Sequence, residues 1–197
     1  MNTPITLTLI NTKNEQPSSS QLNSKKDFTL GTQLLTNSTD ETVEVNHALI
    51  AKRNQEWTIT DESINGTYYR IPHNVPVHIP YGKLIACGLT WIDATNQNLI
   101  KIVDSSFQLL TSFVPRLDFE YIIGQGRSRE HIGNRSDPVI SNQHAKITFH
   151  KDSMTVIDNS DEKITSGTYI SVGKEMKLTN KMQIRIGNYT FCTVRIE

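Results

Sequence analysis

The sequence predicts an all-β protein made of two tandem antiparallel β-sandwich domains. Short runs of β-branched and aromatic residues alternate with Gly, Pro and Asn turn signals throughout the chain. No segment shows a capped helical period of apolar residues. The second half of the sequence also repeats features of the first, and 197 residues are enough for two small domains.

The repeat is clearest around two histidines. His47 and His144 are 97 residues apart (144 − 47), and Asp61 and Asp158 have the same offset (158 − 61), with no gap between the two matched pairs. Two further matches flank this block in the same order in both copies. Phe28–Gly31 matches Tyr121–Gly124 before it, and Asn65–Tyr68 matches Ser166–Tyr169 after it. The sequence therefore predicts two copies of one fold, at residues 1–98 and 99–197.

The expected strands are short and follow one another closely. Residues 5–10 alternate Thr with Ile or Leu, which is typical of a strand with one buried face. Residues 16–24 contain three consecutive serines and are expected to form a loop. Residues 104–118 are too apolar for a free linker, so we expect them to pack, either as the first strand of the second domain or between the domains. The other expected strands are residues 57–60, 68–71, 83–92, 121–123, 145–149, 154–157, 183–186 and 190–196.

Composition excludes several functional classes. The chain has 20 basic and 20 acidic residues, so no net field favours nucleic acid or an anionic membrane. Cys87 and Cys192 have neither CxxC spacing nor a Cys/His cluster, which predicts no disulfide framework, no metal and no cofactor. The most apolar run, residues 84–92, is about half the length of a membrane span. We expect a cytoplasmic chain, or the cytosolic part of a larger membrane-associated protein, that does not itself insert into the membrane.

The sequence also argues against an enzyme. It contains no Gly-x-Ser-x-Gly, HExxH or P-loop motif and no paired carboxylates in a plausible setting. Gly124-Gln125-Gly126 is not followed by a helical pattern, as a nucleotide-binding loop would require. No catalytic residue is therefore predicted.

Three loop segments of the second copy carry suitable groups for binding a phosphate. They are Gly124–Arg129, Ser141–His144 and Thr165–Thr168, and each lies at a predicted strand end. Guanidinium, hydroxyl and backbone N–H groups are the donors that a phosphate dianion requires.

This ordered set resembles the forkhead-associated (FHA) domain, whose Gly-Arg, Ser-x-x-His and Asn-Gly motifs read phosphothreonine. The resemblance implies that Arg127 and Ser141 bind the phosphate and that Asn142 adds a contact from the same loop. Ser166 and Gly167 would contact the ligand backbone. Gly126 and His144 would have a structural supporting role, as would His47 and Gly66 in the first copy.

The match departs from the family pattern at two places. Gly124 is followed by Gln125, so the Gly-Arg register is ambiguous, and Arg129 is the alternative to Arg127. Ser166 replaces the family's Asn, and a hydroxyl cannot donate and accept as a side-chain amide does.

The first copy keeps the fold signature but loses the chemistry. The Gly-Arg position is Gly31-Thr32, and Glu44 replaces the serine three residues before His47. A carboxylate repels a phosphate dianion, so the first copy is expected to dock proteins or to have a structural role.

The sequence therefore predicts an adaptor that binds a phosphothreonine-containing protein through its second copy. The alternative is a phosphorylation-independent docking scaffold for another protein subunit. Two degenerate copies of this size resemble the cytosolic N-terminal segment of EssC-type FtsK/SpoIIIE ATPases of bacterial type VII secretion.

Overall fold

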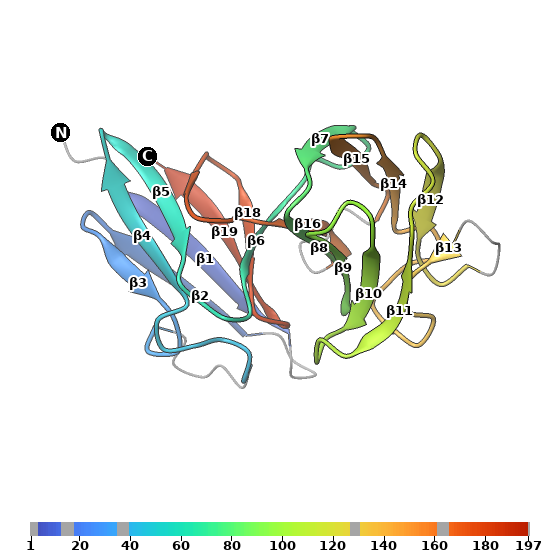
Figure 1. Ribbon diagram of the computed structural model, residues 1–197. Helices are drawn as coiled ribbons and strands as arrows, with labels where there is room; N and C mark the ends of the chain where they lie inside the picture. The colour runs from blue at the N-terminus through green and yellow to red at the C-terminus, as the bar shows by residue number, and fades with distance from the viewer. Residues whose placement is uncertain (1–3, 13–17, 35–39, 127–130, 161–165, 197) are drawn as a thin grey trace. The chain divides into compact units, whose positions relative to one another are not determined.

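A computed structural model describes residues 4–12, 18–34, 40–126, 131–160 and 166–196 (Figure 1). Within these ranges the secondary structure is β-strand with connecting turns, and no α-helix occurs. The predicted all-β class is thus confirmed. No helix in the described ranges is long and apolar enough to cross a membrane.

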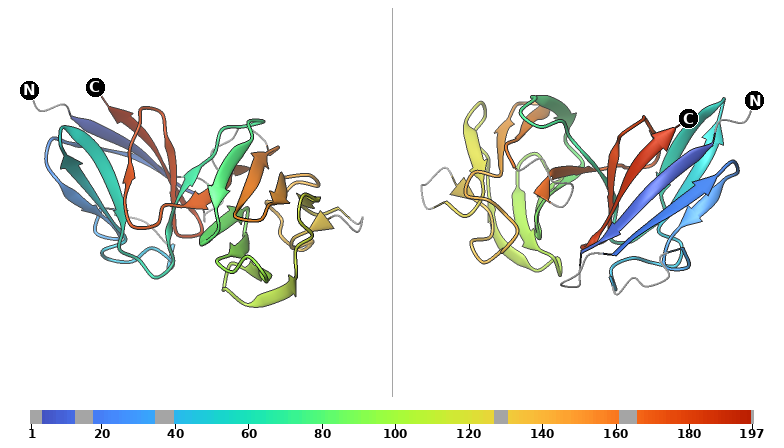
Figure 2. Two further views of the ribbon diagram at one scale, coloured as in Figure 1. Left: turned by 45° about the horizontal axis from the view of Figure 1, so that its top comes forward. Right: turned by 180° about the vertical axis from the view of Figure 1, so that it is seen from behind.

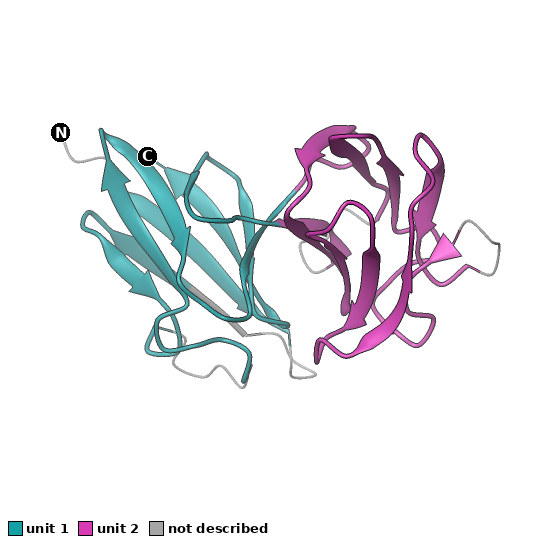
Figure 3. Cartoon of the chain, in the orientation of Figure 1, with its two compact units in different colours: residues 1–70, 171–197 teal, residues 71–170 magenta. Residues whose placement is uncertain are grey.

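The chain divides into two compact units that do not follow the two sequence copies (Figure 3). Unit 1 contains residues 1–70 and 171–197, and unit 2 contains residues 71–170. The predicted division at residues 98 and 99 therefore differs from the way in which the chain packs. Each unit combines the first strands of one copy with the last strands of the other.

Unit 1 is a sandwich of two sheets. One sheet has the order β6-β18-β19-β1-β2, and the other has the order β17-β5-β4-β3. The first sheet is formed by Thr67–Arg70 (β6), Gln183–Ile186 (β18), Thr190–Ile196 (β19), Ile5–Asn11 (β1) and Ser18–Ser24 (β2). The second is formed by Met176–Lys177 (β17), Glu56–Asp61 (β5), Ala48–Arg53 (β4) and Phe28–Leu30 (β3). The loop expected at residues 16–24 is therefore wrong from Ser18 onward, because β2 pairs along its whole length with β1.

Unit 2 has the same plan. One sheet has the order β11-β10-β9-β8-β16, and the other has the order β13-β12-β14-β15-β7. The first is formed by Leu109–Phe113 (β11), Ile100–Asp104 (β10), Thr90–Ala94 (β9), Lys83–Cys87 (β8) and Thr168–Ser171 (β16). The second is formed by His131–Ile132 (β13), Glu120–Ile123 (β12), Ala145–Phe149 (β14), Ser153–Asp158 (β15) and Val77–Pro80 (β7). Pairing is antiparallel except between β12 and β13, which are parallel.

The equivalent strands show a reciprocal exchange between the copies. In unit 1, the central pair β18–β19 comes from the second copy and lies between β6 and β1 of the first copy. In unit 2, the pair β8–β9 comes from the first copy and lies between β16 and β10 of the second. Figure 2 shows both units from other directions, with the red β18–β19 pair beside the blue β1 in unit 1.

A buried aspartate in each unit gives the physical reason why this exchange is tolerated. The Asp40 carboxylate accepts hydrogen bonds from the Tyr189 N–H (2.7 Å) and the Thr190 hydroxyl (3.0 Å) of the second copy. The Asp137 carboxylate accepts the same bonds from the Leu89 N–H (2.6 Å) and Thr90 hydroxyl (2.9 Å) of the first copy.

Both copies thus carry the same acceptor and an equivalent donor pair, although the turn before it is one residue longer in the second copy. Because the donor pairs are equivalent, sequence repetition alone does not specify which hairpin meets which aspartate. Exchange of an identical element is the usual basis of domain swapping. Here it occurs within one chain.

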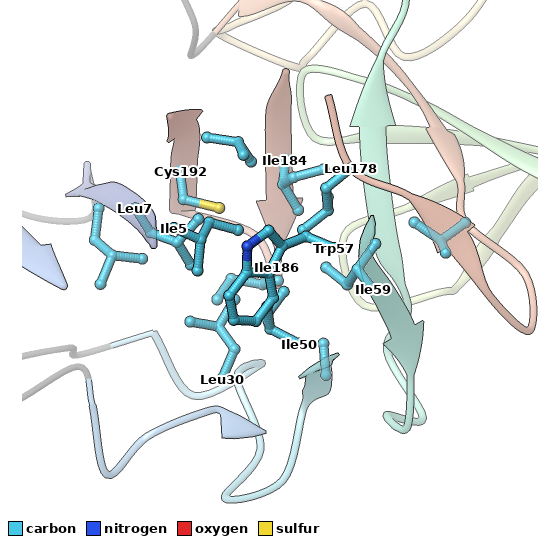
Figure 4. Close-up of a cluster of buried hydrophobic side chains, with 14 of the residues drawn as sticks. Ile5, Leu7, Leu30, Ile50, Trp57, Ile59, Leu178, Ile184, Ile186 and Cys192 are labelled. Atoms are coloured by element: carbon cyan, nitrogen blue, oxygen red, sulfur yellow. The ribbon is translucent and has the colours of Figure 1, made fainter. Parts of the chain in front are cut away.

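The core of unit 1 lies between its two sheets. Trp57 of β5 is 2% exposed and packs with Ile5 of β1 and Ile184 of β18 in one buried cluster (Figure 4). Cys192 of the exchanged strand β19 belongs to the same cluster. The exchanged hairpin therefore contributes to the core as well as to the sheet, and unit 1 depends on it.

Candidate functional site

A buried histidine organises the loops at one end of unit 2. His144 is fully buried, and its Nδ1 accepts a hydrogen bond from the Ser141 N–H at 3.3 Å. Its other ring nitrogen, Nε2, lies 3.4 Å from the Gly167 carbonyl oxygen. Because Nδ1 accepts, Nε2 carries the proton and donates to that carbonyl. One neutral imidazole thus joins the loop before β14 to the loop before β16.

Unit 1 contains the same brace. His47 is fully buried, its Nδ1 accepts from the Glu44 N–H at 3.3 Å, and its Nε2 lies 3.0 Å from the Gly66 carbonyl. In both units the histidine thus lies against the glycine of the next loop, Gly66 in unit 1 and Gly167 in unit 2. The histidines hold loops and do not face a substrate, which supports a structural role.

A threonine–aspartate pair fixes the third loop. The Thr168 hydroxyl donates to the Asp158 carboxylate at 2.9 Å, and Thr67 donates to Asp61 at the same distance in unit 1. Both aspartates also accept a backbone N–H two residues later, from Ser160 and Ser63. The match between the copies thus extends from sequence to individual hydrogen bonds.

The structure settles which glycine ends the strand before the site. A Cβ on Gly124 would lie 2.3 Å from the Asn142 carbonyl oxygen and 2.6 Å from that of Ser141. In unit 1, a Cβ on Gly31 would meet the carbonyl oxygens of Val45 and Glu44 in the same way. Gly124 is therefore the equivalent of Gly31, since both backbones press against the loop before the histidine.

The residue after Gly124 is Gln125, and its side-chain amide is hydrogen-bonded within the unit. The Gln125 Nε2 donates to the Asp137 carbonyl at 2.6 Å, and its N–H donates to the Ser141 carbonyl at 3.2 Å. Gly126 lies two residues further on, where an added Cβ would meet the His131 ring. Arg127 and Arg129 lie outside the described residues, so the assignment of a phosphate-binding arginine stays a prediction.

The Ser141 loop presents unused polar groups to solvent. Ser141 and Asn142 are exposed, while His144 behind them is buried. Among the described residues, no group hydrogen-bonds to the Ser141 hydroxyl or to the Asn142 side-chain amide. Ser166 is partly exposed, beside the buried Gly167. The brace therefore holds two exposed hydrogen-bonding side chains beside the loop that carries Gly167.

The same position in unit 1 is filled by the protein itself. The Glu44 carboxylate accepts hydrogen bonds from the Ile64 N–H (2.7 Å) and the Asn65 N–H (3.4 Å). The Asn65 side-chain amide donates to the Thr42 carbonyl at 3.0 Å. The Glu44 carboxylate thus ties two loops together and adds a negative charge where unit 2 has a hydroxyl.

Comparison with known proteins identifies the family. The FHA domain family matches residues 14–88 and 121–187, which together are more than half of the chain. The chain belongs to the FHA domain family. The two matched segments correspond to the two copies, and the family consists of non-enzymatic protein-interaction modules that bind phosphothreonine.

One solved structure is also similar, the crystal structure of the FHA domain of CT664 protein from Chlamydia trachomatis. It shares 20% identity over 49% of this chain and 94% of its own, with a TM-score of 0.26. No curated protein matches this chain significantly.

Sequence reasoning missed two features of this region. The first is the buried pair Asp40 and Asp137, although their offset is also 97 (137 − 40) and both lie only a few residues before the aligned block. The second is the internal contact of Glu44, which was expected only to repel a ligand. No local signal indicates that contact, because Ile64 and Asn65 are 20 residues or more away along the chain.

Proposed function

We propose that the second-copy loops in unit 2 bind phosphothreonine in a partner protein. The observation that supports this most is the difference at one loop position: the exposed Ser141 hydroxyl has no hydrogen-bond partner among the described residues, whereas the Glu44 carboxylate is engaged by its own unit. A hydroxyl can donate to a phosphate oxygen, and Asn142 adds an amide on the same loop. Arg127 would supply the positive charge from the loop after Gly126.

Peptide binding tests this function. A phosphothreonine peptide library is presented to the full chain, and the best sequence is titrated with and without its phosphate. Arg127→Ala should weaken binding about 10- to 100-fold, because a charge-assisted hydrogen bond contributes roughly 1.5–3 kcal/mol. Arg127→Lys should recover only part of the loss, since a point charge lacks the planar fork.

The neighbouring arginine provides the matched control. Arg129→Ala should change the affinity less than twofold if Arg127 contacts the phosphate. The opposite pattern, with Arg129 essential and Arg127 dispensable, would move the contact to Arg129. Absence of any phosphate-dependent binding would exclude the reader function altogether.

The second candidate is phosphate-independent docking, and the geometry of unit 1 favours it there. Glu44 and Asn65 are both bonded within their own unit, which leaves neither for a phosphopeptide. A chain in which one unit binds phosphothreonine and the other binds a protein independently of phosphate would suit a cytosolic scaffold. The N-terminal segment of a type VII secretion ATPase would be one such scaffold. Binding of a protein partner that persists after phosphatase treatment and after Ser141→Ala would support this function.

A further inference from the structure

The segment around β11 exposes an unusual amount of apolar surface. Five of the ten large apolar side chains that are exposed in the described part of the chain lie between residues 107 and 117. They are Phe107, Leu109, Leu110, Val114 and Leu117, which are 42–72% exposed. Contiguous apolar surface of this kind usually marks an interaction site. We expected residues 104–118 to pack against the protein. This holds only in part, because the Phe113 ring contacts Tyr121 and Phe149 while the five side chains above are exposed.

A groove of about 840 Å³ runs beside this segment in unit 2. One wall is formed by Leu110 of β11 and by Val114, which follows β11. The other wall is formed by β13 and residues 133–136. Phe119 and Tyr121 also line the groove, and their rings contact each other at 4.9 Å between centroids. β11 and β13 are the end strands of the two sheets of unit 2 (Figure 1). The groove therefore lies along one open side of the sandwich.

The groove combines apolar walls with uncompensated positive charge. Arg116 and Arg135 line it, and none of the lining residues that the structure describes is acidic. The Arg116 guanidinium lies 3.7 Å from the centre of the Phe119 ring, and Arg135 is exposed. Within the described part of the chain, no carboxylate forms an ion pair with either arginine. A ligand carrying carboxylates would supply the missing charge.

The free side of β11 offers backbone groups as well. β11 pairs with β10 on one side, and among the described residues no strand pairs with its other side. An exposed apolar edge strand is a template for a strand from another chain.

We propose that this groove binds an extended segment of a partner protein, with alternating acidic and apolar residues, by adding a strand to β11. The partner's apolar side chains would lie on Leu110 and Val114, and its carboxylates would pair with Arg116 and Arg135. A second copy of this chain fits less well, because two copies of the groove would bring like charges together. Ser141 and Asn142 do not line the groove, so the interaction does not require these two side chains, although Gly126 before the predicted phosphate-binding loop does line it.

The probe is a labelled seven-residue peptide, acetyl-Thr-Val-Glu-Val-Glu-Ile-Thr-amide, and its control replaces both Glu by Lys. Each is titrated into the full chain at low ionic strength and followed by backbone amide chemical shifts. The Glu peptide should perturb residues of β11 and residues 131–136, and the Lys peptide should not. Arg135→Glu should weaken binding about fivefold or more, since an attractive pair becomes repulsive.

Two further variants make the test specific. Arg116→Glu should weaken binding similarly, although it also removes the contact with Phe119, so its melting temperature is measured in parallel. Lys174→Glu is the matched control: Lys174 is an exposed residue of unit 1 with the same change in net charge, and affinity should not alter. Ser141→Ala should also leave binding unchanged, which separates this site from the proposed phosphothreonine site.

Four results would overturn the proposal. The first is that the Glu and Lys peptides bind equally well, or that neither of them binds. The second is perturbation of the Ser141 loop in place of β11. The third is concentration-dependent self-association that Leu110→Asp removes, which would make a second copy the occupant. The fourth is protection of β11 by anionic lipid vesicles but not by the peptide, which would make the surface a membrane contact.

Discussion

The two units have the same fold and the same histidine-to-loop hydrogen bonds, but they differ in the side chain at one position of the loop before the histidine. In unit 2 the loop before His144 presents Ser141 and Asn142 to solvent, whereas in unit 1 the equivalent loop is closed by Glu44. The bonds from each histidine to its two loops are otherwise the same. The fold is thus retained independently of the binding chemistry, and one side chain at one position changes what the loop can do.

The comparison also shows how an internal anion stabilises a loop. In unit 1 the carboxylate of Glu44 bonds to backbone N–H groups of residues 64 and 65. It therefore competes with any external anion that would approach the same donors. We infer that the lack of phosphothreonine binding predicted for unit 1 and the stability of this loop have the same cause.

The largest expected effect comes from separating the copies. A chain ending at Asn98 lacks β18 and β19, the two strands between β6 and β1 in unit 1. It should be largely unfolded in an amide correlation spectrum, and it should not bind phosphothreonine peptides. A folded fragment of residues 1–98 would mean that β8 and β9 can replace the exchanged hairpin, and would contradict the dependence of unit 1 on the second copy.

The next effect concerns the histidine braces. His47→Ala and His144→Ala each remove a buried ring and leave one backbone N–H and one carbonyl without a partner. Each should lower the free energy of unfolding by about 2–4 kcal/mol in urea titrations. Asn46→Ala and Gln143→Ala, at the adjacent exposed positions, are the controls and should change it by less than about 0.5 kcal/mol. A large effect in one unit alone would show that the two frames are not equivalent.

Glu44→Ser should have a smaller effect on stability. The carboxylate is partly exposed, so losing its two hydrogen bonds should cost about 0.5–1.5 kcal/mol. The variant should still not bind phosphothreonine peptides through unit 1, because Thr32 occupies the position after Gly31 and offers no charge. Phosphate-dependent binding that survives Ser141→Ala in this background would show that Glu44 alone blocks the site.

The smallest effects are expected in thiol reactivity. Each unit holds one buried cysteine on an exchanged strand, Cys192 on β19 and Cys87 on β8. Burial raises the pKa of Cys192 from 9.0 to about 12, and its hydrogen bond with the Ile184 backbone offsets only part of that rise. The native thiol should therefore react very slowly with a labelling reagent at pH 8.

The two histidine variants test whether the reactivity of each cysteine depends on the histidine of its own unit. His47→Ala should accelerate labelling of Cys192 more than that of Cys87, and His144→Ala should do the reverse. The raised pKa of Cys192 also favours the folded state fully below pH about 9, and that contribution is lost as the pH rises toward 12. Equal acceleration at both cysteines would mean that the units open together.

Much of the fold could be read from the sequence because the repeat is local. His47 and His144, with the Asp61 and Asp158 that follow, lie in an uninterrupted block whose order survives in both copies. The strand exchange could not be read in this way. Both copies supply the same donor pair before the second strand of the hairpin, Leu89-Thr90 in the first and Tyr189-Thr190 in the second, so this pattern does not distinguish swapped from unswapped chains.

The sequence could not fix the register of the Gly-Arg motif. The motif alone left Gly124 and Gly126 as alternatives, and the close approach of Gly124 to the Ser141–Asn142 backbone agrees with the repeat, which matches Gly124 to Gly31. The contact of Glu44 with residues 64 and 65 likewise depends on how two loops meet in space. Such contacts are absent from any local pattern.

The most direct test of the central claim is reciprocal exchange of the two loop residues in the full chain. The affinity for one phosphothreonine peptide is measured for the wild type, for Ser141→Glu and for Glu44→Ser. We predict that Ser141→Glu reduces phosphate-dependent binding at least 10-fold through like-charge repulsion and that Glu44→Ser leaves it unchanged. Binding that persists in Ser141→Glu but disappears in Glu44→Ser would place the reader in unit 1 and contradict the account.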